Sequence, residues 1–123
     1  MIDLELTHAL LTDSFVRVRE GVVEVTEGLE PEQLGHQVGP AANPIGWLVW
    51  HLTRVQDDHL AELAGVEQVW PRWRDRFALP YAADATGYGQ STDEVSQVHV
   101  TAELLAGYHE EVHSLTLRYL DSL

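Results

Sequence analysis

Two histidines four residues apart near the end of the chain are of a type and spacing that could do chemistry. They belong to the run HEEVH at 109–113, which fits the pattern H-E-x-x-H. On a helix, this pattern holds zinc between two imidazoles, with the glutamate as the general base of a metalloprotease. The pattern therefore raises the hypothesis of a small zinc hydrolase, which the rest of the sequence has to support.

A protease site of this kind needs a third protein ligand. The compact metalloprotease pattern asks for glycine and histidine where this chain has Thr116 and Tyr119. On a helical wheel, His109 and His113 lie roughly 80° and 120° from the mean of the apolar stripe. We therefore expect two histidines at the flank or surface of a helix, among solvated glutamates. The alternative is that both meet a histidine from another helix, because their spacing puts them on one side.

Long amphipathic helices must position these residues. Apolar residues at steps of three and four predict a first helix over 4–29, and Pro31 follows its end. The second helix has sharper boundaries: Asn43 is the expected N-cap, Pro44 the first helical residue and Gly65 the end. Its first half is apolar nearly all round, so we expect it to be buried on more than one side.

The connection at 66–90 holds two prolines, two glycines and five aromatic residues without a sustained period. We expect a long connection with one short helical turn. The run STDE at 91–94 has the form of a capping box and predicts a short helix. Thr101 is the expected cap of a third long helix, and no alternating strand pattern occurs. The predicted fold is therefore all-α, a single domain over 1–123 that forms an antiparallel helical bundle.

Composition and charge narrow the classes of function. Twenty acidic residues against seven basic ones, all arginine, give a formal charge of -13. Such a field repels phosphate backbones and anionic lipids, so we expect neither a nucleic-acid nor a membrane partner. The absence of cysteine excludes disulfides, thiolate ligands and a protein thiol nucleophile. Acidic residues near the N-terminus, and no apolar run of ~18 residues, predict a soluble, cytoplasmic protein.

A second candidate for chemistry is His51, which follows four large apolar residues in the run WLVWHLTRVQDDH. A histidine half-buried against tryptophan, with carboxylates one or two turns further on, can serve as a metal ligand or a general base. The alternative is a histidine at the core edge, hydrogen-bonded to a neighbour or to water. Asp57, Asp58 and His59 are interpreted as a solvated helix face, with a ligand role as their alternative.

Four segments carry a resemblance to a known family: NPIGWLVWHLTRVQDDHLAELAG at 43–65, EQVW, GYG, and AELLAGYHEEVHSLTLRYL. The resemblance extends over essentially the whole chain, and the first of these segments is its most specific part. The chain resembles the DinB-like superfamily, and more narrowly its actinobacterial branch that includes mycothiol S-transferases. The resemblance implies a four-helix bundle that binds a divalent metal, often zinc or nickel, through a histidine on the second helix. His51 matches that ligand.

The resemblance also implies a further long helix, which would follow the position of Leu123. In the family this helix carries the other ligands, a histidine and a second histidine or carboxylate four residues apart. The HEEVH run lies on the preceding helix, so it does not match that pair. We therefore expect a chain that continues, a partner that supplies the helix, or no metal site. Three helices would expose an apolar patch, which favours a homodimer, an exchange of elements or a longer chain.

The function implied by the resemblance is metal-dependent transfer of a thiol. A divalent ion, zinc first, can bind a thiol as thiolate and keep it nucleophilic at neutral pH. This suits mycothiol or a similar small thiol that attacks an electrophilic substrate. The alternative, from a different class, is a non-catalytic helical bundle for association or stress-linked binding, with a vestigial metal site.

Three of the seven basic side chains lie close together in the run PRWRDRF, as Arg72, Arg74 and Arg76. They could meet a polar or anionic cosubstrate in an otherwise acidic protein. The alternative is a loop that neutralises its acidic surroundings.

Overall fold

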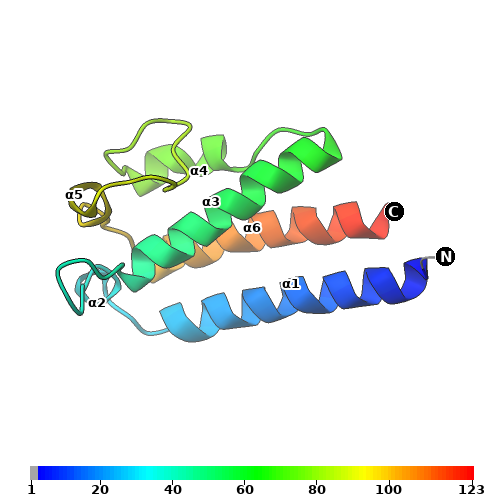
Figure 1. Ribbon diagram of the computed structural model, residues 1–123, viewed down its shortest axis with the longest axis horizontal. Helices are drawn as coiled ribbons and strands as arrows, with labels where there is room; N and C mark the ends of the chain where they lie inside the picture. The colour runs from blue at the N-terminus through cyan, green and yellow to red at the C-terminus, as the bar shows by residue number, and fades with distance from the viewer. Residues whose placement is uncertain (1–2) are drawn as a thin grey trace.

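The computed structural model describes residues 3–123, and these form an all-helical fold (Figure 1). The three long helices are α1 (Leu4–Thr26), α3 (Ile45–Ala64) and α6 (Ala102–Asp121), and the three short ones are α2 (Pro31–Leu34), α4 (Trp70–Phe77) and α5 (Thr92–Val95). The predicted fold class is confirmed. In the described part of the chain, no helix is long and apolar enough to cross a membrane.

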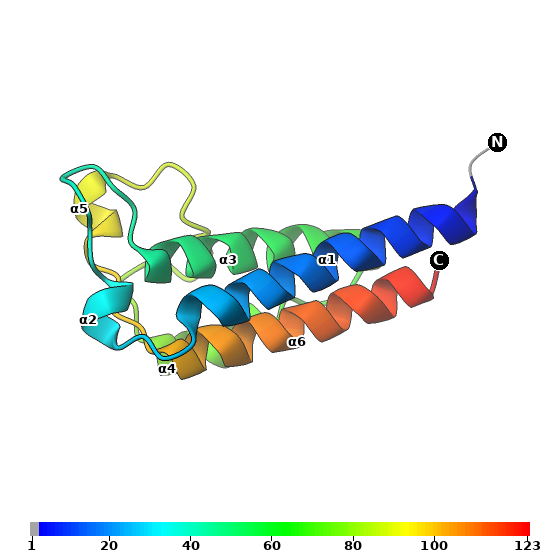
Figure 2. The same ribbon diagram turned by 90° about the horizontal axis from the view of Figure 1, so that it is seen from below.

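The long helices lie side by side, with α1 antiparallel to both α3 and α6 (Figures 1 and 2). Two contacts fix the register of α1 against α6: His8 lies 2.9 Å from Asp121 and Arg19 lies 2.6 Å from Glu110. The helices α3 and α6 run in the same direction, because the segment 65–101 returns the chain to the end of the bundle where α3 began.

The boundaries of the first two long helices differ slightly from the prediction. Helix α1 ends earlier than predicted, at Thr26. Helix α3 begins one residue later, so Pro44 and not Asn43 is the N-cap. Pro44 has an extended backbone, and its carbonyl already accepts a hydrogen bond from the Leu48 amide at 3.0 Å, as a half-helical cap does. Gly65, with a φ of 68°, ends α3 as predicted.

The shorter helices were only partly predicted. Helix α2, which Pro31 opens, was missed. Helix α4 has about two turns where one was expected, because Trp73 and Phe77 follow a helical spacing and bury one apolar face. The capping box at Ser91 and the N-cap at Thr101 are confirmed, since both hydroxyls accept the predicted backbone hydrogen bonds.

Aromatic side chains from α3, α4, α6 and the loop after α4 fill the core. Trp50 is fully buried, with its ring 6.2 Å from that of Trp70 and 5.1 Å from that of Tyr81. Tyr108 of α6 packs 5.1 Å from Trp70. The first half of α3 is therefore buried on more than one side, as its apolar run predicted.

An apolar groove of about 430 Å³ stays open between α1 and α3. Its lining includes Phe15 and Val18 of α1 and Leu52, Val55 and Leu63 of α3. The side chains of Val18 and Leu63 are 40% and 69% exposed. The exposed apolar patch expected for three long helices is therefore present, and it lies between α1 and α3.

Candidate functional site

His51 is held in one orientation by residues of α3 and of the loop before α5. Its ring stacks on that of Trp47, with centroids 4.6 Å apart and an interplanar angle of 18°. Its Nδ1 lies 2.5 Å from the carbonyl oxygen of Thr86, so Nδ1 carries the proton and donates it. Trp47 in turn donates from Nε1 to Oε1 of Gln90 at 2.8 Å. We call Trp47, Thr86, Gly87 and Gln90 the His51 clamp.

Gly87 allows the loop to approach the imidazole. Its φ of 96° lies in the left-handed region, which disfavours any side chain. A Cβ placed there would lie 2.6 Å from Nδ1 of His51 and 3.0 Å from the ring of Trp47. Glycine is therefore required at this position both by its backbone and by its neighbours.

The hydrogen bond to Thr86 leaves Nε2 of His51 as the nitrogen with a lone pair. Within residues 3–123, this Nε2 makes no hydrogen bond. Metal-ligating histidines are oriented in the same way, by donating their other N–H to a carbonyl or carboxylate. The orientation of His51 fits a ligand and also fits a general base. Its metal-ligand role stays a prediction.

His109 and His113 are buried in the bundle, and the prediction that they lie at a helix flank or surface is wrong. Their exposed fractions are 1% and 5%. The wheel failed because α6 packs against α1 on one side and against α3 and α4 on others. Its buried arc is therefore wider than the single apolar stripe from which the angles were measured.

Thr53 of α3 orients His109 of this buried pair. Nδ1 of His109 lies 3.0 Å from Oγ1 of Thr53, which donates its own proton to the carbonyl of Val49 at 2.8 Å. Nδ1 of His109 is therefore the donor. Nε2 of His109 and Nδ1 of His113 are buried without a hydrogen-bond partner among the described residues. Burial, followed by the neighbouring His113, lowers the pKa of His109 to about 4. Burial also lowers the pKa of His113, which leaves both rings neutral at pH 7.

The structure does not bring His51 to this pair. His51 and Thr53 are two residues apart on α3, about 200° around the helix. His51 faces the loop at 86–90, whereas Thr53 faces α6. In the described part of the chain, no group of three or more His, Asp or Glu side chains could hold a metal. His51 thus fits as one ligand, but residues 3–123 do not complete a ligand set around it.

Asp57 is buried, so its interpretation as part of a solvated face is wrong. Its carboxylate accepts hydrogen bonds from the backbone amides of Val69 and Trp70, both at 2.8 Å, and from the Tyr108 hydroxyl at 2.7 Å. Arg54 lies 3.8 Å away and is also buried. Asp57 therefore ties the start of α4 to α3 and α6. The i,i+3 spacing of Arg54 and Asp57 was the one sequence signal for this role.

Comparison with known proteins identifies the family. The model of the DinB superfamily matches residues 14–123. The chain belongs to the DinB superfamily. A crystal structure of a conserved protein from Enterococcus faecalis resembles this DinB-superfamily chain with a TM-score of 0.85 and 24% sequence identity, and the alignment covers 94% of this chain and 69% of that one. The likeness to that structure shows the fold. No curated protein matches the sequence.

Proposed function

We propose that this DinB-superfamily chain acts in a metal-dependent thiol S-transferase, with His51 as one ligand of a divalent ion, zinc in the first instance. The observation that supports the proposal is the orientation of His51. Its Nδ1 donates to Thr86 at 2.5 Å, and its Nε2 retains a lone pair. A histidine held in this way is ready to bind a cation without losing side-chain freedom in the process.

The nucleophile in this proposal comes from a cosubstrate, because the chain contains no cysteine. Mycothiol or a similar small thiol fits this role, and the second substrate is an electrophile. A divalent ion lowers the pKa of a thiol bound to it, so that the sulfur is a thiolate at neutral pH. The chain's own contribution is to orient His51, while Trp47 covers one face of its ring.

The proposal requires ligands that residues 3–123 do not bring to His51. A catalytic zinc site has three protein ligands and keeps one position open. The family resemblance predicts the other two as a histidine and a second histidine or carboxylate. Residues outside 3–123, or a second copy of the chain, would supply them. His109 and His113 do not serve here, because His109 contacts Thr53, which lies on another side of α3 from His51, and no three possible ligands come together within residues 3–123.

The test is the metal content of His51→Ala. The matched control is His59→Ala, because His59 is an exposed histidine on the same helix. Both variants and the unaltered protein are loaded with zinc, desalted and analysed by elemental mass spectrometry. We expect His51→Ala to lose the bound zinc and His59→Ala to retain it. Full zinc content in His51→Ala would contradict the assignment. Loss of thiol transfer from mycothiol to a chromogenic electrophile should accompany the loss of metal.

Association is a second candidate function, and the apolar groove between α1 and α3 favours it. The occupant we propose is a second copy of this chain, which would make the protein a homodimer. Val18→Glu places a charge in the groove, whereas Val25→Glu places one on the exposed part of α1 outside it. We expect Val18→Glu to abolish the dimer in light scattering and Val25→Glu to leave it intact. A monomeric unaltered protein at high concentration would contradict this function.

A further inference from the structure

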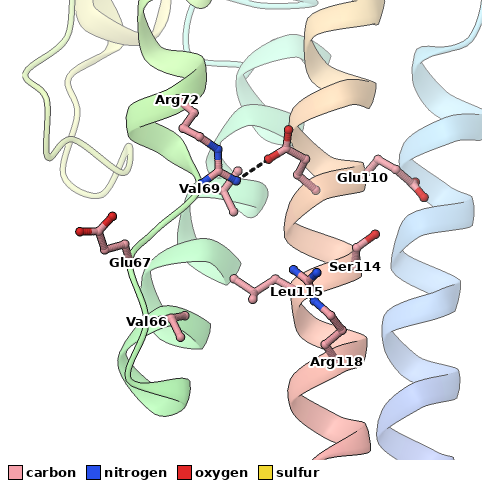
Figure 3. Close-up of a pocket in the computed structure, with 9 residues that line it drawn as sticks. Val66, Glu67, Val69, Arg72, Glu110, Ser114, Leu115 and Arg118 are labelled. Carbon is pink, nitrogen blue, oxygen red and sulfur yellow. Dashed lines mark hydrogen bonds and ion pairs between the residues drawn. The ribbon is translucent and has the colours of Figure 1, made fainter.

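A cleft of about 420 Å³ opens between α6 and the segment that leads into α4, and it shares no residue with the His51 clamp. Figure 3 shows Val66, Val69 and Arg72 on one side of this cleft and Leu115 and Arg118 of α6 on the other. The volume lies within the roughly 300–1,000 Å³ that is usual for sites of small molecules. Its walls combine apolar side chains with arginine.

The acidic residues at this cleft are neutralised or turned away from it. Glu111 accepts a hydrogen bond from Nη2 of Arg72 at 2.7 Å. Glu110 accepts one from Nε of Arg19 at 2.6 Å, and its carboxylate points toward α1 (Figure 3). The carboxylate of Glu67 points away from α6 in the same view. The interior of the cleft is therefore less negative than the acidic composition of the chain suggests.

Arg118 adds an uncompensated positive charge to the cleft. Arg118 lines the cleft, and its guanidinium lies beside Leu115 (Figure 3). Within residues 3–123, it forms neither an ion pair nor a side-chain hydrogen bond. Arg118 lies in the last turn of α6, where its positive charge interacts favourably with the negative end of the helix dipole. That interaction leaves the N–H donors of the guanidinium available to a ligand.

We propose that this cleft binds a small organic anion, namely a carboxylate with a short apolar body. A guanidinium presents a planar fork of donors that matches a carboxylate, and Arg72 keeps further N–H groups beside the one that Glu111 uses. The apolar body would lie on Val66, Val69 and Leu115. The overall charge of -13 does not forbid this, because physiological salt screens exposed charges beyond about 8 Å.

The probe for this site is isovalerate, and its neutral counterpart isovaleramide has the same apolar body. In an NMR titration of isotope-labelled protein, isovalerate should shift the backbone amides of Val66, Val69 and Leu115 until saturation. Isovaleramide and inorganic phosphate should each bind at least about tenfold more weakly, because one lacks the charge and the other the apolar body. Binding of either one as tight as that of isovalerate would overturn the proposal, as would the absence of saturable shifts.

Arg118→Gln is the variant that tests the positive charge, and Arg17→Gln is its matched control. Both remove one positive charge, but Arg17 lies on α1 in an exposed ion pair with Asp13. Arg118→Gln should weaken the binding of isovalerate about tenfold and leave the binding of isovaleramide unchanged. Arg17→Gln should alter the affinity for neither compound. Equal weakening in both variants would mean that net charge attracts the anion, which overturns the proposal. The acid and amide comparison needs no variant, so the proposal stays testable if Arg118→Gln fails to fold.

Discussion

Replacing Gly87 by alanine tests whether the clamp holds His51. The new Cβ would lie 2.6 Å from Nδ1 of His51, whereas ordinary contact begins at 3.4 Å. The ring or the loop must therefore separate by about 0.8 Å. If the ring moves along the line from the Thr86 oxygen to Nδ1, now 2.5 Å long, the distance grows to about 3.3 Å, outside the usual range of a hydrogen bond. We expect the imidazole to lose its fixed tautomer.

Gly89→Ala is the matched control, because Gly89 also has a positive φ, 75°, but has no atom within 4 Å of an added Cβ. Each variant carries left-handed backbone strain of roughly 1–2 kcal/mol. Gly87→Ala alone adds overpacking, which typically costs about 1–3 kcal/mol. We therefore expect the free energy of unfolding to fall by about 2–5 kcal/mol in Gly87→Ala and about 1–2 kcal/mol in Gly89→Ala.

Urea unfolding followed by tryptophan fluorescence measures the two losses, and NMR of the imidazole nitrogens reports the tautomer of His51. The unaltered protein and Gly89→Ala should both keep the proton on Nδ1, whereas Gly87→Ala should not. Equal destabilisation in the two variants, with the same His51 tautomer in both, would refute the clamp and the orientation on which the proposed metal site depends.

Two further predictions concern buried polar groups. The pKa of His109 falls from 6.5 in the unfolded chain to about 4 in the folded protein. As the pH falls from 7 to 5, the unfolded state therefore binds a proton that the folded state does not, and the free energy of unfolding should decrease by about 2 kcal/mol. In urea unfolding, His109→Gln should reduce this loss of stability with falling pH, whereas the substitution of the exposed His99 by Gln should leave it unchanged. An undiminished loss in His109→Gln would show that His109 is not its cause. Asp57→Ala leaves Arg54 buried and unpaired, so thermal and urea unfolding should show a loss of about 3–5 kcal/mol. Asp58→Ala should lose less than about 1 kcal/mol, and similar losses in both would contradict the role of Asp57.

The helices were largely predictable from local sequence, because caps act within three or four residues of the chain. Ser91, Thr101 and Gly65 therefore mark the ends that they were expected to mark. The start of α3 was predicted one residue too early. The φ of Pro44, -63°, is also that of a helical residue, and only its ψ of 153° makes it extended. The three aromatic residues of α4 have a helical spacing, but the two prolines in the connection favoured the prediction of a loop with one short turn.

The sequence by itself determined the long helices, the acidic charge, the absence of a protein thiol and the place of His51 at the edge of an apolar stripe. Only the tertiary structure decided what each side chain meets. It buried His109 because α6 packs on several sides, and a helical wheel assumes one. It also placed the carbonyl of Thr86, 35 residues further along the chain, against Nδ1 of His51. No local pattern encodes that contact, because it depends on how the loop crosses back over α3.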